Sequence, residues 1–119
     1  MKSRVIRLSW PRHALWDNEK ASHMAKAEAK RTQRKEAWAL VLEAKWPRDP
    51  AAVLTFRFCP PDRRRRDTHN LPATMKAAID GIADAMKVDD VGFRCVFPTE
   101  FGPVEKGGAV YIEIGGKTT

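Results

Sequence analysis

The chain has 119 residues, with 22 Lys and Arg against 15 Asp and Glu, which gives a formal net charge of +7. The length suits one domain, which we expect to span residues 1–119, and no apolar run approaches the roughly 20 residues of a membrane span. The first residues lack the apolar stretch of a signal peptide and the two cysteines lack metal-binding spacing, so we expect a cytoplasmic protein without zinc and with no membrane partner. The basic excess favours a polyanion, most simply nucleic acid, as the partner.

The N-terminal third predicts a strand and a long helix. Apolar and β-branched residues indicate a short strand over 5–8, which Trp10-Pro11 ends. From about Asn18 to Lys45 the chain is rich in strong helix formers and has no Gly or Pro, so one helix is expected there. We expect its packing face to be formed by the apolar residues of its second half, which are Ala37, Trp38, Val41, Leu42 and Ala44.

The middle of the chain predicts a strand, a polar connection and a second helix. Residues 52–59 alternate apolar and polar side chains, as a half-buried strand does. The polar residues 63–70 follow, and Asn70 and Pro72 are expected to cap and begin a helix. The buried stripe expected for this helix is Met75, Ile79, Ile82 and Met86. Lys76, Asp80 and Asp84 share a different face.

The C-terminal third predicts two strands. Residues 91–97 and 109–114 alternate, a Lys-Gly-Gly turn at 106–108 lies between them, and residues 115–119 form a frayed tail. The resulting order β-α-β-α-β-β predicts an α/β (α+β) domain with a small mixed β-sheet and two helices.

The residues with the most chemical meaning lie between 61 and 90. Arg63, Arg64, Arg65 and Arg66 stand directly before Asp67, and adjacent guanidinium groups suit a phosphate ligand. Asp89-Asp90 is a second acidic pair, and hard cations such as Mg²⁺ take one or two carboxylates with water and phosphate. Each feature also has a plain alternative: a solvated arginine loop, an acidic turn and, for Lys76, a solvated helix lysine.

Taken together, these features resemble the RusA family of Holliday-junction resolvases. The resemblance covers the Pro-Asp-Arg-Arg-Arg-Arg-Asp-x-x-Asn-Leu run that begins at Pro61, the Lys-Ala-Ala-x-Asp run from Lys76, Asp89-Asp90, and the Lys-Gly-Gly run from Lys106. It is close over the C-terminal half and loose over the long basic helix. The resemblance implies a RusA-like fold and a homodimeric, Mg²⁺-dependent endonuclease that resolves four-way DNA junctions by paired nicking, with Mn²⁺ as an alternative ion.

The resemblance also implies site residues. Asp67 matches the family's first catalytic aspartate, Asp90 the third, and Lys76 the catalytic lysine. His69 stands where the family has its second aspartate, and residues 72–74 look like a small insertion before Lys76. His69 is either a turn residue or a substitute metal ligand that suits Mn²⁺ better than Mg²⁺.

The expected metal ligands are therefore Asp67 and Asp90, with Asp89 and His69 as further candidates, and the expected DNA-binding residues are Arg63, Arg64, Arg65, Arg66 and Lys106. Because a helix separates the two main aspartates, one site requires either that residues 67–71 and 87–90 fold back along that helix or that two subunits share the site. A catalytically weakened, structure-specific DNA-binding protein is the alternative function, and a module for RNA or single strands ranks last. We interpret the tryptophans as packing residues, although Trp16 could stack on a base at a branch point.

Overall fold

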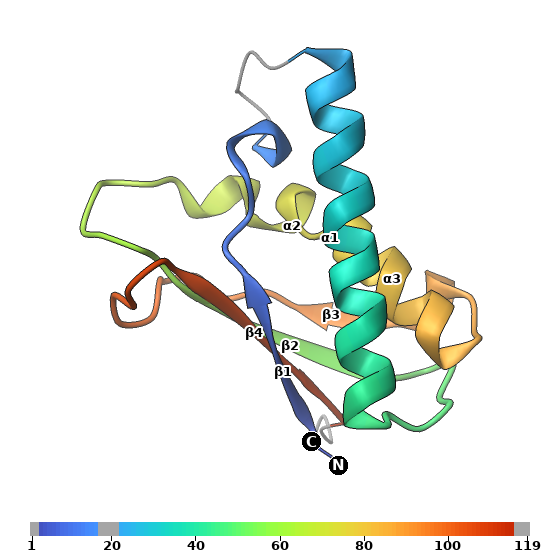
Figure 1. Ribbon diagram of the computed structural model, residues 1–119. Helices are drawn as coiled ribbons and strands as arrows, with labels where there is room; N and C mark the ends of the chain where they lie inside the picture. Colours follow the sequence, from blue (N-terminus) through green and yellow to red (C-terminus); the bar gives the residue numbers. More distant parts are fainter. Residues whose placement is uncertain (1–2, 17–21, 116–119) are drawn as a thin grey trace.

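The computed structural model describes residues 3–16 and 22–115 and contains one mixed four-stranded sheet (Figure 1). The strand order is β1-β4-β2-β3, in which β4 pairs antiparallel with β1 and β2, and β3 pairs parallel with β2. The strands are β1 (Val5–Ser9), β2 (Val53–Cys59), β3 (Arg94–Val96) and β4 (Ala109–Ile114). The predicted mixed sheet and the order β-α-β-α-β-β are confirmed.

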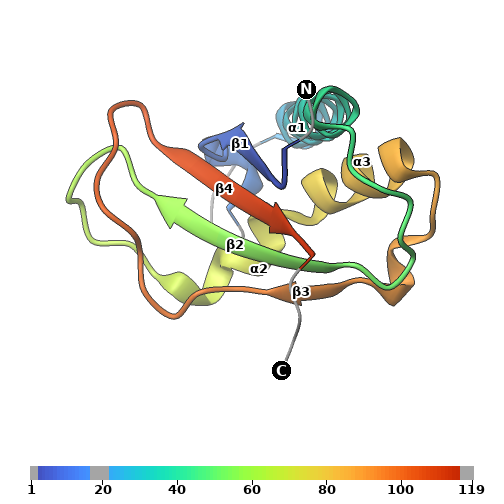
Figure 2. The same ribbon diagram turned by 90° about the horizontal axis from the view of Figure 1, so that it is seen from below.

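Two helices cover one face of this sheet. Figure 2 looks along α1 (His23–Ala44) and shows it on the same side of the sheet as α3 (Lys76–Met86). The shorter helical segments are η1 (His13–Leu15), η2 (Thr68–Asn70), α2 (Leu71–Thr74) and η3 (Asp90–Gly92). No helix among residues 3–16 and 22–115 is both long enough and apolar enough to cross a membrane.

The core lies between the sheet and the two helices. In β2, Leu54, Phe56 and Phe58 are buried as their alternation predicts. The stripe expected on the second helix is also present, with Met75, Ile82 and Met86 buried and Ile79 packed against the core. The sheet face away from the helices carries the exposed residues of each strand, so the fold has one core and one open sheet face.

The packing face of α1 differs from the expectation. Trp38 and Leu42 are 41% and 46% exposed, whereas the buried residues of the helix are Ala29, Gln33, Ala37, Val41 and Ala44. The reason is the close approach of α3, since a Cβ added at Gly81 would overlap the Arg34 carbonyl oxygen. Because α3 lies so close, only a narrow stripe of mostly small residues on α1 fits against it. The larger side chains of Trp38 and Leu42, next to this stripe, are left outside the contact.

Several predicted boundaries are wrong. The helix expected from Asn18 begins at His23, where the Ser22 hydroxyl accepts a hydrogen bond from the Ala25 N–H (3.1 Å); residues 17–21 lie outside the described residues. Asn70 makes no side-chain cap, and the second helix is interrupted at Met75, between α2 and α3.

The third strand is shorter than the sequence predicts. The strand expected over 91–97 is shortened to Arg94–Val96 because residues 90–92 form a 3-10 turn, which leaves Val91 86% exposed. Of the expected tail, residues 116–119 lie outside the described residues.

Candidate nucleic-acid interface

Asp67 caps the short segment that follows the arginine run. Its Oδ1 atom accepts a hydrogen bond from the His69 backbone N–H at 2.8 Å and lies 2.7 Å from His69 Nδ1. These contacts, the backbone N–H foremost, lower the pKa of Asp67, so its carboxylate is ionised at neutral pH. The Asp67 side chain is 60% exposed and that of His69 is 90% exposed, so both are open to a ligand.

Asp90 belongs to a second cluster, at the beginning of α3. Its Oδ2 atom lies 2.9 Å from Lys76 Nζ, and the same ammonium group lies 3.0 Å from Asp80 Oδ1. Lys87 has a left-handed conformation (φ 60°) that ends α3 and turns the chain, and Asp90 then returns to Lys76 at the start of the helix, as the first of the two arrangements requires of residues 87–90. Asp89 points elsewhere, because its Oδ1 accepts from the Val91 N–H at 3.0 Å.

The Lys76–Asp90 contact keeps both groups charged. The ammonium group lowers the pKa of Asp90, while Asp90 first and Asp80 second raise the pKa of Lys76. Lys76 is thus a stable cation at neutral pH, suited to balancing negative charge rather than accepting a proton.

The four expected metal ligands fall into two pairs, Asp67 with His69 and Asp89 with Asp90. Within residues 3–16 and 22–115, no three His, Cys, Asp or Glu side chains gather into a group that could hold a metal. The described side chains therefore form no metal site of three or more such ligands, and a site made by Asp67 and Asp90 with water and phosphate stays a prediction. The donors themselves fit Mg²⁺, which binds proteins through one or two carboxylates and takes its remaining ligands from water and phosphate.

The four arginines before Asp67 have different roles. The Arg66 side chain is only 14% exposed, forms an ion pair with Asp62 Oδ1 at 2.9 Å and lies 5.5 Å from the centre of the Trp10 ring. The guanidinium groups of Arg63, Arg64 and Arg65 form no ion pair with an acidic side chain in the described part of the chain, although the Arg64 backbone N–H donates to Asp62 Oδ1 at 2.9 Å and the Arg64 charge helps to lower the pKa of Asp62. Arg66 therefore holds the loop in place, and its three neighbours remain free to bind a ligand.

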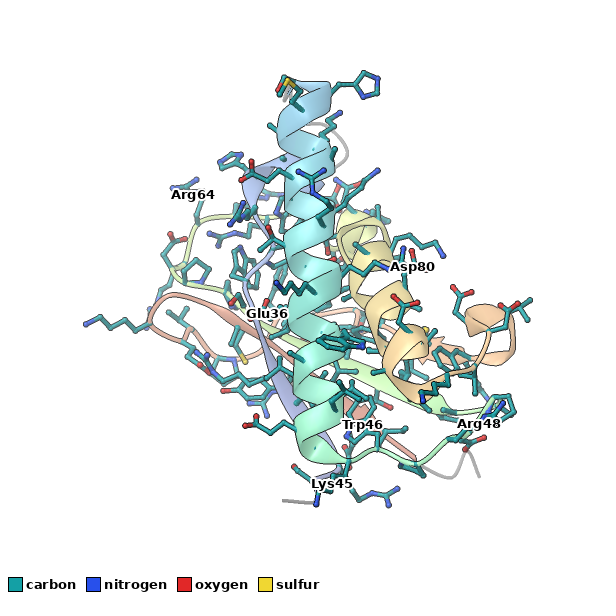
Figure 3. All side chains as sticks on the ribbon, turned by 45° about the vertical axis from the view of Figure 1, so that its right-hand side comes forward. Glu36, Lys45, Trp46, Arg48, Arg64 and Asp80 are labelled. Carbon is teal, nitrogen blue, oxygen red and sulfur yellow. The ribbon has the colours of Figure 1, made fainter. Side chains whose placement is uncertain are left out.

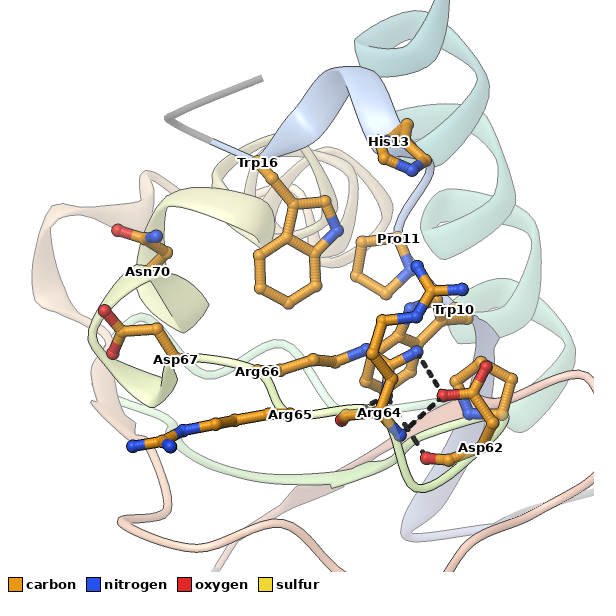
Figure 4. A pocket seen from close by; sticks show the side chains of 11 residues that line it. Trp10, Pro11, His13, Trp16, Asp62, Arg64, Arg65, Arg66, Asp67 and Asn70 are labelled. Atoms are coloured by element: carbon orange, nitrogen blue, oxygen red, sulfur yellow. Dashed lines mark hydrogen bonds and ion pairs between the residues drawn. The ribbon is translucent and has the colours of Figure 1, made fainter.

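A cavity of about 440 Å³ lies beside this loop (Figure 4). In Figure 4 the Trp16 ring points into it from the η1 side, with Asp67 and Asn70 to one side and Pro11 and Trp10 to the other. Arg64 and Arg65 line the same cavity, which we call the arginine pocket. The sequence singled out the arginine run with Asp67 and, separately, Trp16, but it did not predict that they line one cavity, because residues 10–16 and 64–67 meet only in the folded chain.

A second cavity of about 580 Å³ lies between α1 and α3, and we call it the helix pocket. In the view of Figure 3, Arg64 of the arginine pocket and Asp80 of the helix pocket lie on opposite sides of α1. Trp16 lines both pockets. The cationic residues of the helix pocket are Lys26, Lys30, Arg31, Arg34 and Lys76.

Some of these cations already have partners. Arg34 forms an ion pair with Asp84 (2.6 Å), and Lys76 with Asp80 and Asp90, whereas Lys26, Lys30 and Arg31 have no acidic partner among the described residues. Lys106, the remaining residue expected to bind DNA, lies in the turn before β4 and lines neither pocket.

Gln33 is a positioning residue that sequence reasoning also missed. It is 5% exposed; its Nε2 donates to the Thr74 carbonyl oxygen (2.8 Å) and its Oε1 accepts from the Ala78 N–H (2.9 Å). These bonds fix the break between α2 and α3, and therefore the start of α3, where Lys76 lies. The available signal was one amide side chain in an otherwise apolar stripe of α1.

Comparison with known proteins identifies a relative. No family model matches the chain. Over 118 residues the chain is 31% identical to a protein of Xylella fastidiosa (strain Temecula1) described as uncharacterized, an alignment that covers 95% of this chain and 76% of that protein.

Proposed function

This chain belongs to the same family as the Xylella fastidiosa protein, and we propose that it is a metal-dependent endodeoxyribonuclease that resolves four-way DNA junctions, as the RusA family does. One observation carries the proposal. The ionised carboxylate of Asp67 lines the same cavity as the unpaired guanidinium groups of Arg64 and Arg65. Guanidinium groups bind a phosphate, and the carboxylate beside them offers a metal ligand, which is the combination that phosphodiester hydrolysis needs.

The proposed roles follow from these positions. Asp67 and Asp90 would hold a divalent ion, Mg²⁺ or Mn²⁺, and the bound ion would supply an activated water. Lys76, kept charged by Asp90, stabilises the negative charge that develops on the phosphate. The free arginines and Lys106 hold the DNA backbone by charge and shape, since phosphate contacts carry no direct sequence information.

The proposed assembly is a homodimer on cytoplasmic DNA. A two-fold dimer matches the near two-fold symmetry of a four-way junction and presents one nicking site to each of two opposed strands. It also doubles the formal charge from +7 to +14 (2 × 7), which strengthens attraction to DNA.

A second candidate function is structure-specific DNA binding with weakened catalysis. Two observations favour it. His69 stands where the RusA family has an aspartate, and the described side chains do not gather three metal ligands. Such a protein keeps the pockets and their cations but cuts slowly or not at all.

One cleavage experiment separates the two functions. Four-way, forked, duplex and single-stranded DNA are each incubated with the parent protein, with and without Mg²⁺ or Mn²⁺. The nuclease proposal predicts paired nicks in the four-way substrate that require the ion. Binding without cleavage in either ion supports the second function and refutes the first.

Matched variants then test the site. Asp67→Asn and Asp90→Asn are expected to abolish cleavage and to leave junction binding equal or tighter, because a negative charge near the phosphate is lost. The amide side chain of Asp67→Asn retains an oxygen for the bond from the His69 N–H, so the loop is preserved. Asp49→Asn is the control, because Asp49 makes the same kind of local bond, to the Ala51 N–H at 3.0 Å, outside both pockets. Full cleavage by either site variant contradicts the assignment.

A further inference from the structure

Trp16 lies at the boundary between the arginine pocket and the helix pocket and lines both. Cations without acidic partners among the described residues lie to either side of it: Arg64 and Arg65 in one pocket, and Lys30 and Arg31 in the other. An aromatic ring flanked on both sides by unpaired cations is the arrangement that binds a single-stranded nucleotide. The ring stacks on a base, and the cations hold the phosphates that precede and follow that base.

The Trp16 ring packs against Trp10 and is only partly buried. Its centroid lies 6.1 Å from that of Trp10, which in turn makes an edge contact with Phe58 at 6.1 Å and carries the Arg66 guanidinium. The backbone N–H of Trp16 donates to the His13 carbonyl oxygen at 3.1 Å, which fixes the end of η1. Trp16 itself is only partly buried, and its indole N–H bonds to no residue in the described part of the chain.

We infer that Trp16 is a base-stacking residue, which takes one unpaired base of a branched DNA while the adjoining phosphates enter the two pockets. The inference rests on the proposed function, because it takes branched DNA as the ligand. It adds a recognition element that phosphate contacts lack, since only a branched or single-stranded DNA offers an unstacked base. The two cavities, about 440 and 580 Å³, are each within the range of small-ligand sites.

Trp16 packs against the core with part of its side chain, but the remaining neighbours of its ring are not those of a core residue. A packing tryptophan is surrounded by apolar side chains, whereas the arginine pocket also contains Arg64, Arg65, Asp67 and Asn70. Trp38 offers the comparison within the same protein. It is 41% exposed on α1 and lines neither pocket, so its ring has no cationic flanks to guide a nucleotide.

The test uses a forked DNA with 2-aminopurine at the first unpaired position, a four-way junction and a plain duplex. Trp16→Leu is expected to weaken binding of the fork and the junction about 5- to 100-fold, the range for loss of one stacked base. Binding of the duplex stays within about 2-fold, by the same reasoning. Stacking quenches 2-aminopurine, so the parent protein lowers its fluorescence and Trp16→Leu does not.

Two variants keep the result interpretable. Trp16→Phe retains a stacking ring and is expected to keep most of the affinity and quenching, and Trp38→Leu is expected to match the parent. Circular dichroism confirms that each variant is folded. Equal loss in folded Trp16→Phe and Trp16→Leu overturns the inference, because stacking then contributes nothing.

The cleavage readout distinguishes this inference from the proposed function. If the parent cuts junctions and Trp16→Leu binds and quenches as the parent does, the stacking role is wrong and the nuclease stands. If Trp16→Leu loses fork binding but the parent never cuts with Mg²⁺ or Mn²⁺, the stacking role stands and the nuclease proposal fails. A parent that binds no branched DNA refutes both.

Discussion

Replacing Gln33 with leucine removes a buried polar side chain that links α1 to the break before α3. The change keeps a similar volume but leaves the buried Ala78 N–H and the buried Thr74 carbonyl without their partners. A buried polar backbone group that loses its hydrogen bond costs about 1–3 kcal/mol. Two such losses are partly offset by the burial of the apolar leucine side chain. We therefore expect the free energy of unfolding to fall by about 2–4 kcal/mol.

Urea denaturation measures this effect. With a slope of about 2 kcal/mol per molar urea, which is typical of a small domain, the midpoint of Gln33→Leu should fall by about 1–2 M at unchanged slope. Thr32→Leu is the control, since Thr32 is exposed on the same helix and a substitution there should stay within about 0.5 kcal/mol. Under conditions in which Gln33→Leu is still folded, we expect junction cleavage to fall more than junction binding. The reason is that Gln33 positions the start of α3, which carries Lys76. A midpoint equal to that of the parent would show that the two hydrogen bonds of Gln33 do not stabilise the fold.

Replacing His69 with aspartate is expected to lower the Mg²⁺ concentration needed for cleavage, because an anionic oxygen replaces an imidazole nitrogen; a metal titration unchanged by the substitution contradicts a ligand role. The double change Arg64→Ala and Arg65→Ala should flatten the log–log salt dependence of duplex binding by about 1.8, which is two contacts at about 0.9 each. Arg66→Ala should leave that slope unchanged and instead lower the thermal midpoint, since Arg66 is bonded inside the loop. A slope insensitive to the double change identifies the run as a solvated loop.

The sheet was predictable because its strands repeat with a period of two. Leu54, Phe56 and Phe58 alternate with exposed Thr55 and Arg57, and that pattern alone determines which side of β2 faces the core. Which face of α1 packs against the core was harder to predict from the sequence. Its sequence offers apolar side chains on two adjacent ridges, and only the close approach of α3 at Gly81 selects one of them.

The candidate site shows the same contrast between local and tertiary information. The run of arginines before Asp67 is local, so the sequence identifies it as a phosphate-binding candidate. The distinction among those arginines is tertiary, because within the described part of the run only the Arg66 guanidinium both contacts the ring of Trp10 and forms an ion pair with Asp62. The same loop lines a cavity with Trp16, about fifty positions earlier in the chain, and no periodicity or motif connects such distant residues.

Asp67 and Asp90 can act on one phosphate either within one subunit or across a dimer, and an experiment with mixed subunits distinguishes the two arrangements. Asp90 already returns to Lys76 at the start of α3, the end of that helix nearest in sequence to Asp67. This favours a site built within one subunit. We therefore expect that a co-expressed mixture of Asp67→Asn and Asp90→Asn subunits leaves the junction uncut, because every site then carries one lesion.

A mixture of parent and Asp67→Asn subunits is the control for this experiment. Its heterodimers retain one intact site and should nick one strand, which proves that mixed dimers form. A site shared across the dimer predicts the opposite for the doubly mutant mixture. Asp67 of one subunit and Asp90 of the other would restore one intact site, so single-strand nicking by that mixture would refute assembly within one subunit.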